Sequence, residues 1–259
     1  MLSVRVLVIL PTYNEAPNIA EVIQRLHQAC SDAGVLVVDD ASPDGTAQVV
    51  EALASEFVGV ELLRRTHKLG FGSACLDGFR RGLEQGFDAL VAMDSDLSHD
   101  PNVLPQLLEH LESAEQHYGL VIGSRYVPGG SIPQWSWYRL LLSRWGNQWA
   151  RLMLGLPVLD ATSGYRVYRA ATLEKIDLDE VRSEGYGFQI EMVRRIVALG
   201  GSVAEVPIAF VDRVAGESKM STRIIVEALW LVTWWSVQDR VWGVRNRVRK
   251  LRKFSESGR

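Results

Sequence analysis

The chain has 259 residues, of which 47% are hydrophobic and 23% charged, and its formal net charge is −3. This composition excludes an intrinsically disordered chain and predicts one large globular domain, or one domain with an extension. Seven basic residues and no acidic residue lie between Arg240 and Lys253. The rest of the chain is therefore more acidic than the total suggests, and the basic segment indicates an anionic partner.

The first strand is expected at residues 4–10, an apolar run that contains Arg5. The run has only seven residues and lacks a small-residue cleavage site, so it is not typical of a signal peptide. Cys30 and Cys75 lie in apolar helical patterns without metal-ligand spacing, which predicts reduced thiols in the core. These features together favour a cytoplasmic protein.

Apolar strands alternate with helices through the first half of the chain. Further strands are expected at residues 35–38, 60–64, 89–93 and 119–123. Helices are expected between Pro17 and Cys30, at residues 44–57, around residues 75–83, and at residues 102–112. This alternation predicts an α/β fold with a mostly parallel sheet covered on both faces. Ligands bind such sheets beyond the carboxyl ends of the strands.

Polar segments follow four of the expected strands: PTYNE at 11–15, DDASPDGT at 39–46, DSDLSHD at 94–100 and SRYVPGG at 124–130. Three of them contribute carboxylates and the fourth contributes Arg125, so one edge of the sheet would form an acidic pocket with an arginine. Such a pocket suits a phosphate bridged by a divalent metal ion. The chain lacks a Gly-x-Gly-x-x-Gly motif after the first strand and a Walker lysine motif, which argues against a dinucleotide cofactor and a P-loop.

Asp94 and Asp96 directly follow the apolar residues 89–93. Where a strand ends and turns, one carboxylate can face a ligand while the other anchors the loop. Hard cations such as Mg²⁺ and Mn²⁺ prefer carboxylate oxygens and bind phosphate oxygens on their other side. An isolated Asp-x-Asp pair is also common in solvated turns, and Asp100 has the position of a helix cap. The strand end and the other polar loops favour the metal interpretation.

Seven motifs together resemble glycosyltransferase family 2, and within it the dolichol- or polyprenol-phosphate mannose synthases. They are LPTYNE, VVDDASPDGT, MDSDLSHDP, SRY, SGYRVYR, EGYGFQIEMVRRI and EVPIAFVDRVAGESKMS, and they extend from about residue 4 to about residue 225. The resemblance implies a Rossmann-like, GT-A type nucleotide-sugar transferase domain. It also implies transfer of mannose from GDP-mannose to a polyprenyl phosphate, with inversion at the anomeric carbon.

The same resemblance implies which residues bind the donor. These are Pro11, Tyr13, Glu15, Val38, Asp39, Asp40, Asp94, Ser95, Asp96, Arg125, Arg213 and Lys219. The first three would contact the nucleoside, although Asn14 and Glu15 also suit a helix cap before Pro17. Asp39 and Asp40 would accept hydrogen bonds from the base or ribose, whereas Asp44 and Gly45 are typical of a turn.

Catalysis would depend on Asp96, Arg213 and Lys219, the last two on a loop over the donor diphosphate. Asp96 is the expected main ligand of Mg²⁺ or Mn²⁺. Some relatives place a glutamine ligand two positions later, where this chain has Ser98, a weaker donor. The second protein ligand therefore remains open between Ser98 and Asp94, with water as the alternative.

The acceptor phosphate would be bound by Ser131 and Arg139. The segment at 131–156, which also carries Arg144, mixes tryptophans, arginines and aliphatic residues. It would form either the lipid-side wall of the acceptor site or a pair of core helices. A phosphomonoester is largely dianionic at neutral pH because its second pKa is about 6. The reaction therefore needs no strong general base, and none is assigned.

The stretch at 224–237 is the most apolar late segment, but its 14 residues include Glu227. About 20 apolar residues are needed to span a bilayer. The tryptophans at 230, 234, 235 and 242 beside the basic run predict an amphipathic helix at an anionic membrane surface. The alternative is a helix that docks on the domain or on a membrane partner protein.

We therefore expect a catalytic domain at 1–222 and a membrane-interface extension at 223–259, located at the cytoplasmic face of the membrane. Nucleic acid is not an expected partner, because nothing besides the basic tail supports it. One alternative is transfer of glucose or another sugar to the same lipid. The other is a non-catalytic module that binds nucleotide sugars and assists membrane assembly.

Overall fold

The computed structural model describes residues 4–113, 116–212 and 226–239. Its strands are β1 Val6–Thr12, β2 Gly34–Asp39, β3 Val60–Arg64, β4 Ala89–Ala92, β5 Tyr118–Ser124, β6 Arg166–Arg169 and β7 Ser202–Pro207. Its α-helices are α1 Ile19–Ala29, α2 Thr46–Glu56, α3 Phe71–Glu84, α4 Leu104–Leu111, α5 Trp137–Leu154, α6 Ala170–Leu173 and α7 Gly185–Ala198. Short 3₁₀ helices lie at η1 Pro101–Val103 and η2 Leu178–Glu180, and residues 226–239 are also helical.

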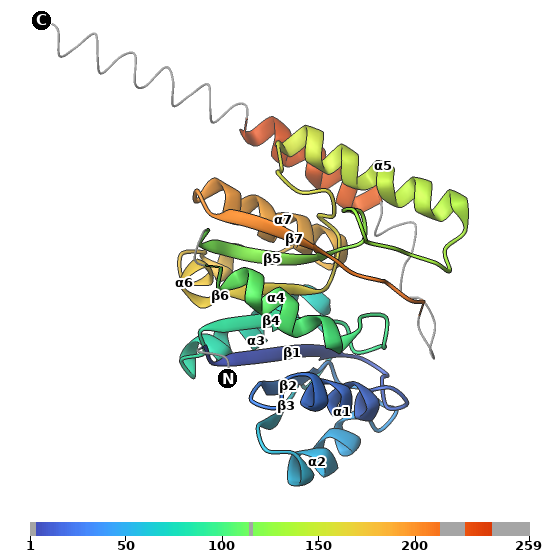
Figure 1. Ribbon diagram of the computed structural model, residues 1–259, viewed down its shortest axis with the longest axis vertical. Helices are drawn as coiled ribbons and strands as arrows, with labels where there is room; N and C mark the ends of the chain where they lie inside the picture. Colours follow the sequence, from blue (N-terminus) through green and yellow to red (C-terminus); the bar gives the residue numbers. More distant parts are fainter. Residues whose placement is uncertain (1–3, 114–115, 213–225, 240–259) are drawn as a thin grey trace, which may run out of the picture.

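The strands form one sheet in the order β3-β2-β1-β4-β6-β5-β7 (Figure 1). The pairs β1–β2, β1–β4, β2–β3 and β5–β7 are parallel, while β6 is antiparallel to both of its neighbours. All strands except β6 therefore point in one direction. The carboxyl ends of β1, β2, β4 and β5 meet at one edge, which confirms the expected mostly parallel α/β sheet.

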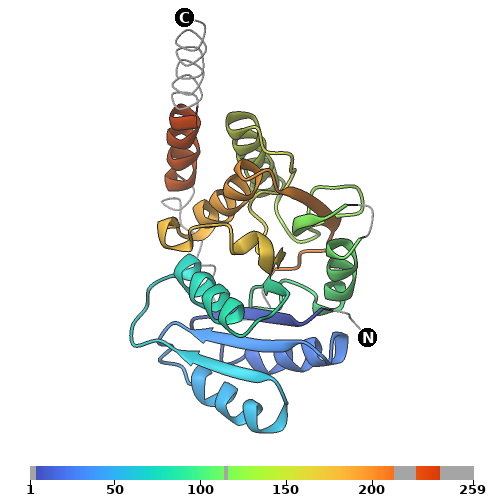
Figure 2. The ribbon, with the colours of Figure 1, turned by 90° about the vertical axis from the view of Figure 1, so that its left-hand side faces the viewer.

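The alternation of buried residues along the strands divides the core into two layers. Val6, Val8 and Leu10 pack with α1, α2 and α4, whereas Leu7 and Ile9 pack on the opposite face with α3 and α7. Figure 2 shows these helices on the two sides of the sheet. Helices on both faces explain why the central strands are apolar on both faces.

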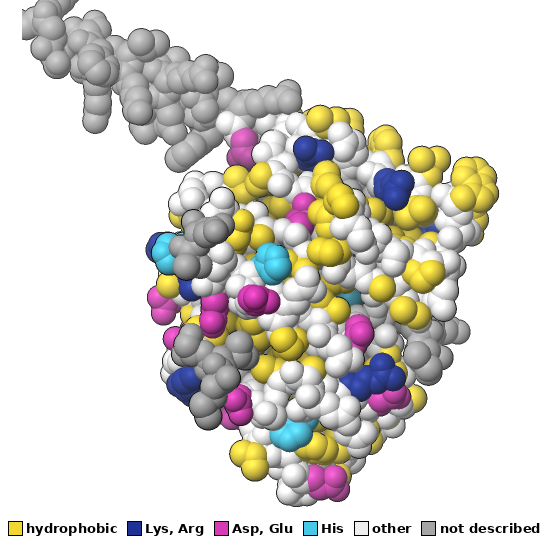
Figure 3. All heavy atoms as spheres, viewed as in Figure 1, with side chains coloured by type: hydrophobic (Ala, Val, Ile, Leu, Met, Phe, Trp, Pro, Cys, Tyr) yellow, Lys and Arg dark blue, Asp and Glu magenta, His cyan; other side chains and the backbone are white. Residues whose placement is uncertain are grey.

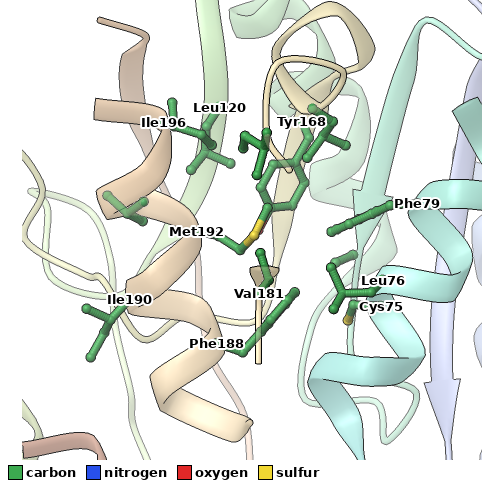
Figure 4. Close-up of a cluster of buried hydrophobic side chains, with 14 of the residues drawn as sticks. Cys75, Leu76, Phe79, Leu120, Tyr168, Val181, Phe188, Ile190, Met192 and Ile196 are labelled. Atoms are coloured by element: carbon green, nitrogen blue, oxygen red, sulfur yellow. The ribbon is translucent and has the colours of Figure 1, made fainter. Parts of the chain in front are cut away.

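The layer between α3 and α7 contains three of the largest fully buried side chains, those of Tyr168, Phe79 and Phe188 (Figure 4). Phe79 of α3 makes an edge contact with Tyr168 of β6, at 4.9 Å between ring centroids. Met192 of α7 points into the same cluster. Cys75 is fully buried there and Cys30 is buried in the other layer, and neither forms a disulfide. The expectation of core thiols is thus confirmed.

Residues 226–239 dock one face on α7. Val232 and Trp235 are buried in the layer with α3 and α7, and Arg194 forms an ion pair with Asp239. The expected boundary at 222/223 lies outside the described residues. The inner face of this helix therefore belongs to the core of the same domain, as the docking alternative proposed. No helix in the described ranges combines the length and apolar character needed to cross a bilayer.

Helix α3 approaches the sheet through its glycines. A Cβ on Gly78 would lie 2.5 Å from Cγ2 of Ile9, a fully buried residue. Because the χ1 angle of isoleucine is stiff, Ile9 has little freedom to move away. Gly146 in α5 has no atom within 4 Å of the corresponding position.

We expect Gly78→Ala to reduce the free energy of unfolding by about 1–3 kcal/mol, because overpacking outweighs the better helix propensity of alanine. Gly146→Ala is the matched control and should stabilise the protein by up to about 1 kcal/mol. Urea unfolding of both variants measures the difference. Equal effects of the two substitutions would contradict the proposed packing constraint.

Candidate active site

The carboxylates of Asp94 and Asp96 lie at the end of β4. Asp96 is 3% exposed, and its Oδ1 accepts hydrogen bonds from the Ser98 backbone N–H (3.1 Å) and hydroxyl (2.5 Å). The hydroxyl of Ser95 donates to the carbonyl of Pro11 at 3.1 Å and so connects β4 to β1. Ser98 thus orients Asp96 within its own turn, and the side chain of Ser95 links two strand ends.

Asp94 is held between His99 and Gly164. Its backbone N–H donates to Nδ1 of His99 (3.4 Å), and its Oδ2 lies 3.7 Å from the same nitrogen. A Cβ on Gly164 would approach Oδ1 of Asp94 to 3.0 Å, so a larger residue would crowd this carboxylate. Burial lowers the pKa of His99 below its ordinary value, although Asp94 acts in the opposite direction. A neutral His99 therefore accepts at Nδ1 and carries its proton on Nε2.

The loop after β1 is fixed by the loop after β2. The Ser42 hydroxyl accepts from the Asn14 N–H, the Thr46 hydroxyl accepts from the Glu15 N–H, and Asp44 accepts from the Ala16 N–H. Asp44 also accepts from the N–H and hydroxyl of Thr46. This confirms the turn role predicted for Asp44. Within the loop, Oε2 of Glu15 accepts from the side chain of Asn18 at 2.9 Å.

Asp39 and Asp40 have different environments at the end of β2. Asp39 is 1% exposed and accepts from the Ser42 N–H (3.1 Å) and from the Thr12 hydroxyl (3.4 Å). Asp40 accepts from three donors on the loop after β3, namely the N–H groups of Leu69 and Gly70 and the guanidinium of Arg65. Asp40 therefore anchors that loop. The nucleoside contacts predicted for Asp39 and Asp40 stay predictions.

The side chain of Val38 is fully buried within the sheet. Its carbonyl accepts from the Thr12 hydroxyl at 3.3 Å, beside the pair of Thr12 and Asp39. Val38 consequently packs the core beneath the nucleoside loops. The donor contact that the resemblance implies for Val38 stays a prediction.

Arg125 forms a buried ion pair with Asp160. Its Nε and Nη2 each lie 2.7 Å from a carboxylate oxygen of Asp160, and Nη2 also donates to the Thr162 hydroxyl at 2.8 Å. Burial raises the pKa of the Asp160 carboxyl, but the charge and hydrogen bonds of Arg125 outweigh this and lower it. The phosphate contact predicted for Arg125 stays a prediction beside this ion pair. Its guanidinium joins the end of β5 to the segment before β6.

An aromatic cluster connects this ion pair to the Asp94 loop. Phe210 lies 5.4 Å from His99 and 5.8 Å from Trp135 between ring centroids, and Arg125 lies over the Phe210 ring. The Val211 N–H donates to the carbonyl of Ser98. The chain beyond β7 thus crosses the Asp94–Ser98 turn. Arg213 and Lys219, the predicted catalytic cations, lie outside the described residues, just after this crossing.

The predicted acceptor residues lie beside the same crossing. The Ser131 N–H donates to the Ile208 carbonyl, and Ser131 is exposed. Arg139 lies 4.0 Å over the Trp135 ring and 3.3 Å from Oδ1 of Asp212. A mainly apolar pocket extends from Arg139 between α5, α7 and the helix at 226–239, lined also by Leu142, Tyr186, Ile190, Leu229 and Val232. Burial raises the pKa of Tyr186 above its ordinary value.

Comparison with known proteins identifies the family. The model of glycosyl transferase family 2 matches residues 7–177. The chain belongs to glycosyltransferase family 2. It is 50% identical over 244 residues to the undecaprenyl-phosphate mannosyltransferase of Micrococcus luteus, covering 94% of this chain and 99% of the relative. It is 46% identical over 246 residues to the polyprenol monophosphomannose synthase of Mycolicibacterium smegmatis, covering 95% and 92% of the two chains.

The fold of this family 2 glycosyltransferase is similar to the folds of solved structures. Glucosyl-3-phosphoglycerate synthase from Mycobacterium tuberculosis, in complex with Mn²⁺ and UDP-glucose, superposes with a TM-score of 0.61 at 21% identity. The match covers 88% of this chain and 76% of that one. This likeness shows the fold, a Rossmann-like GT-A type domain with a nucleotide-sugar transferase architecture.

The donor set of the glycosyltransferase suits a divalent cation held together with a ligand. Asp94 and Asp96 supply hard carboxylate oxygens at one strand end, which matches the preference of Mg²⁺ and Mn²⁺. In the described part of the chain, no three His, Cys, Asp or Glu side chains cluster as a metal site. Asp96 and Asp94 stay the predicted ligands of such an ion.

Several residues that shape the site were missed in the sequence. His99 positions Asp94, Asp160 neutralises Arg125, and Tyr186 lies between the ion pair and the apolar pocket. The motifs around them were visible, but Asp160 does not follow an apolar strand. Its partner is 35 positions away in sequence. No local pattern reports such a contact.

Replacing Arg125 with methionine would leave the Asp160 carboxylate buried without its countercharge. We expect a loss of about 3–5 kcal/mol in the free energy of unfolding at neutral pH. In the wild type, the lowered pKa of Asp160 contributes stability above the unfolded-state pKa, and this is lost as pH falls through the native pKa. In Arg125→Met the native pKa of Asp160 should rise instead. The difference in the free energy of unfolding between wild type and variant should therefore shrink as the pH approaches about 4.

Urea unfolding across this pH range measures the effect. The double variant Arg125→Met/Asp160→Asn is the control, because it leaves no buried charge and should recover part of the lost stability. A difference that does not depend on pH, with no recovery in the double variant, would contradict the assigned pairing.

Proposed function

We propose that the protein transfers mannose from GDP-mannose to a polyprenyl phosphate, with inversion at the anomeric carbon and with Mg²⁺ or Mn²⁺. The observation that carries the proposal is the carboxylate pair at the end of β4 in a chain 50% identical, over nearly its whole length, to an undecaprenyl-phosphate mannosyltransferase. The named acceptors of both similar relatives are polyprenyl phosphates. The donor base and the metal are part of the proposal.

The donor would lie across the carboxyl ends of β1, β2 and β4, as in other sheets of this type. Tyr13, Glu15 and Asp39 would contact the nucleoside, since they lie at the ends of β1 and β2. Asp96 and Asp94 would hold the cation against the diphosphate. The cation, when bound, supplies charge stabilisation to the departing diphosphate. Arg213 and Lys219, two residues of the segment after β7, would add positive charge there.

The acceptor phosphate supplies its own nucleophile, because its second pKa of about 6 makes it largely dianionic at neutral pH. The protein then has to align a phosphate oxygen behind the anomeric carbon and exclude water. Attack from the side opposite the diphosphate inverts the configuration. Arg139 and Ser131 would position that phosphate beside the chain crossing that follows β7.

The apolar pocket beyond Arg139 fits the first isoprenoid units of the acceptor. Its lining includes Leu142, Ile190 and Val232, and it opens beside Trp135 and Tyr186. A lipid that enters there would keep its phosphate near Arg139 and its chain among apolar side chains. This arrangement favours the lipid-wall interpretation of the segment at 131–156.

The outer face of this region fits a membrane surface. Trp137, Leu141 and Leu152 of α5 are 77%, 61% and 68% exposed, and Trp230 on the helix at 226–239 is 61% exposed. Figure 3 shows hydrophobic side chains gathered at the end of the molecule formed by α5 in Figure 1. Helix α5 contains three arginines and no acidic residue. Its charge therefore complements anionic lipid headgroups.

The basic segment at 240–253 follows the helix at 226–239 directly in the sequence. We propose that α5 and the extension at 223–259 together bind the cytoplasmic face of the membrane, next to the catalytic domain at 1–222. A membrane protein that binds the same face is the alternative partner. Binding to vesicles that contain lipid and no membrane protein would support the lipid surface as the partner, and lack of binding would support a membrane protein.

Transfer of radiolabelled mannose to a polyprenyl phosphate tests the reaction. We expect transfer from GDP-mannose that requires Mg²⁺ or Mn²⁺, and an activity at least about 100-fold lower in Asp96→Asn. Asp100→Asn is the matched control, because Asp100 caps η1 through the Asn102 N–H and asparagine also serves as a cap. Its activity should remain close to wild type.

Each competing function predicts a different result in the same assay. Transfer from UDP-glucose instead of GDP-mannose would keep the reaction class and replace the mannose donor. Donor binding without any transfer, with the lipid acceptor and vesicles present, would favour the non-catalytic module. Activity that persists in Asp96→Asn would contradict the metal assignment.

Co-sedimentation with phosphatidylcholine–phosphatidylglycerol vesicles tests the membrane face. The double variant Trp137→Ser/Leu141→Ser should bind about tenfold or more weakly, since each buried large side chain contributes roughly 1.5–3 kcal/mol. Val58→Ser is the control, because Val58 is 92% exposed and lies after α2. Unchanged binding of the double variant would exclude α5 as the contact.

A further inference from the structure

The loop after β3 crosses the end of β2 and contacts the loop after β1. In the sheet register, Asp39 pairs with Thr12 of β1 on one side and with Arg64 of β3 on the other. Past the strand ends at Thr12, Asp39 and Arg64, Nζ of Lys68 lies 3.5 Å from the centroid of the Tyr13 ring. Two loops that flank Asp39 in the sheet therefore meet directly at the edge where the donor is proposed to bind.

The position of Lys68 is fixed by its neighbours in the chain. Oδ1 and Oδ2 of Asp40 accept from the N–H groups of Leu69 and Gly70, each at 2.8 Å. Arg65 donates to the same carboxylate from the other side of Lys68, at 2.9 Å. The backbone on both sides of Lys68 is thus held by one buried carboxylate, while Lys68 itself is exposed. An ammonium on a fixed loop can act as a recognition group.

We propose that Lys68 is a specificity-determining residue for the nucleobase of the donor, selecting a purine with an acceptor oxygen at position 6. This inference rests on the proposed guanine nucleotide. Asp39 can accept only from base N–H groups, such as those on N1 and N2 of guanine. Lys68 can only donate, and O6 and N7 of guanine are both acceptors. The two residues would therefore read opposite sides of one base.

The same chemistry disfavours adenine. Adenine keeps the N7 acceptor but carries an amino group at position 6, so a donor replaces one of the two acceptors that guanine offers to the Lys68 ammonium. The Lys68 ammonium lies over the face of the Tyr13 ring, and Tyr13 is one of the residues proposed to contact the nucleoside. The ammonium is therefore at the proposed base site.

Calorimetric titration of the full chain with GDP, IDP and ADP in the presence of Mg²⁺ tests the proposal. IDP retains O6 and N7 but lacks the amino group on C2. In Lys68→Met we expect binding of GDP and IDP to weaken about tenfold each and binding of ADP to change less than about twofold. Lys68→Arg should retain the wild-type preference, because arginine also donates to O6 and N7. Lys175→Met is the control, since Lys175 is exposed and follows α6 at the opposite edge.

The outcomes separate this inference from the proposed function. Equal weakening of all three nucleotides, or no change in any, would overturn the role of Lys68 in reading the base. A wild-type protein that binds UDP more tightly than GDP would overturn both the proposed donor and this inference. Selective loss of GDP and IDP binding in Lys68→Met supports the inference even if mannosyl transfer is not observed, because the titration requires no acceptor.

Discussion

Carboxylates that accept backbone N–H groups hold the loops at the carboxyl edge of the sheet. Asp44 binds the loop after β1, Asp40 binds the loop after β3, and Glu184 accepts from Gly72 and Ser73 at the start of α3. Because each acid belongs to a different loop from the one that it fixes, the loops support one another. This mutual support fixes the donor edge, since loops otherwise lose much conformational entropy on ordering.

The same principle operates on the acceptor side of the sheet. Glu205 of β7 accepts from the N–H groups of Leu159 and Asp160, and Asp160 in turn holds Arg125 at the end of β5. Glu205, Asp160 and Arg125 each have hydrogen-bond partners within this network, so burial of the Asp160 and Arg125 charges is tolerated. Arg125 then supports the aromatic cluster on which Trp135 rests. The charged side chain of Arg125 thus shapes the acceptor side through this ion pair and these aromatic rings.

The acids of the site have different surroundings. Asp40, Asp44 and Asp160 each accept from several donors of the protein. The side chain of Asp94 is 32% exposed, so a ligand can reach it. The apolar end formed by α5 and residues 226–239 lies beyond β7 (Figures 1 and 2). The proposed lipid pocket connects that end to Arg139.

The sequence by itself determined the alternation of strands and helices, the polar strand ends and the family. These signals are local: apolar periodicity reports burial, and the motifs lie within short stretches. It did not show β6 and β7, because Arg166 and Arg169 interrupt the apolar pattern of β6. Arg166 is nevertheless fully buried, since three backbone carbonyls accept from it.

Only the tertiary structure decided the partners of these polar residues. Asp39 and Asp40 are adjacent and chemically identical, yet Asp40 accepts from the loop after β3 whereas Asp39 accepts from Ser42 and Thr12. Arg125 forms a buried ion pair with Asp160, which no local pattern predicted. The physical reason is the same in each case: a side chain's role depends on partners distant in sequence, and only folding brings those partners together.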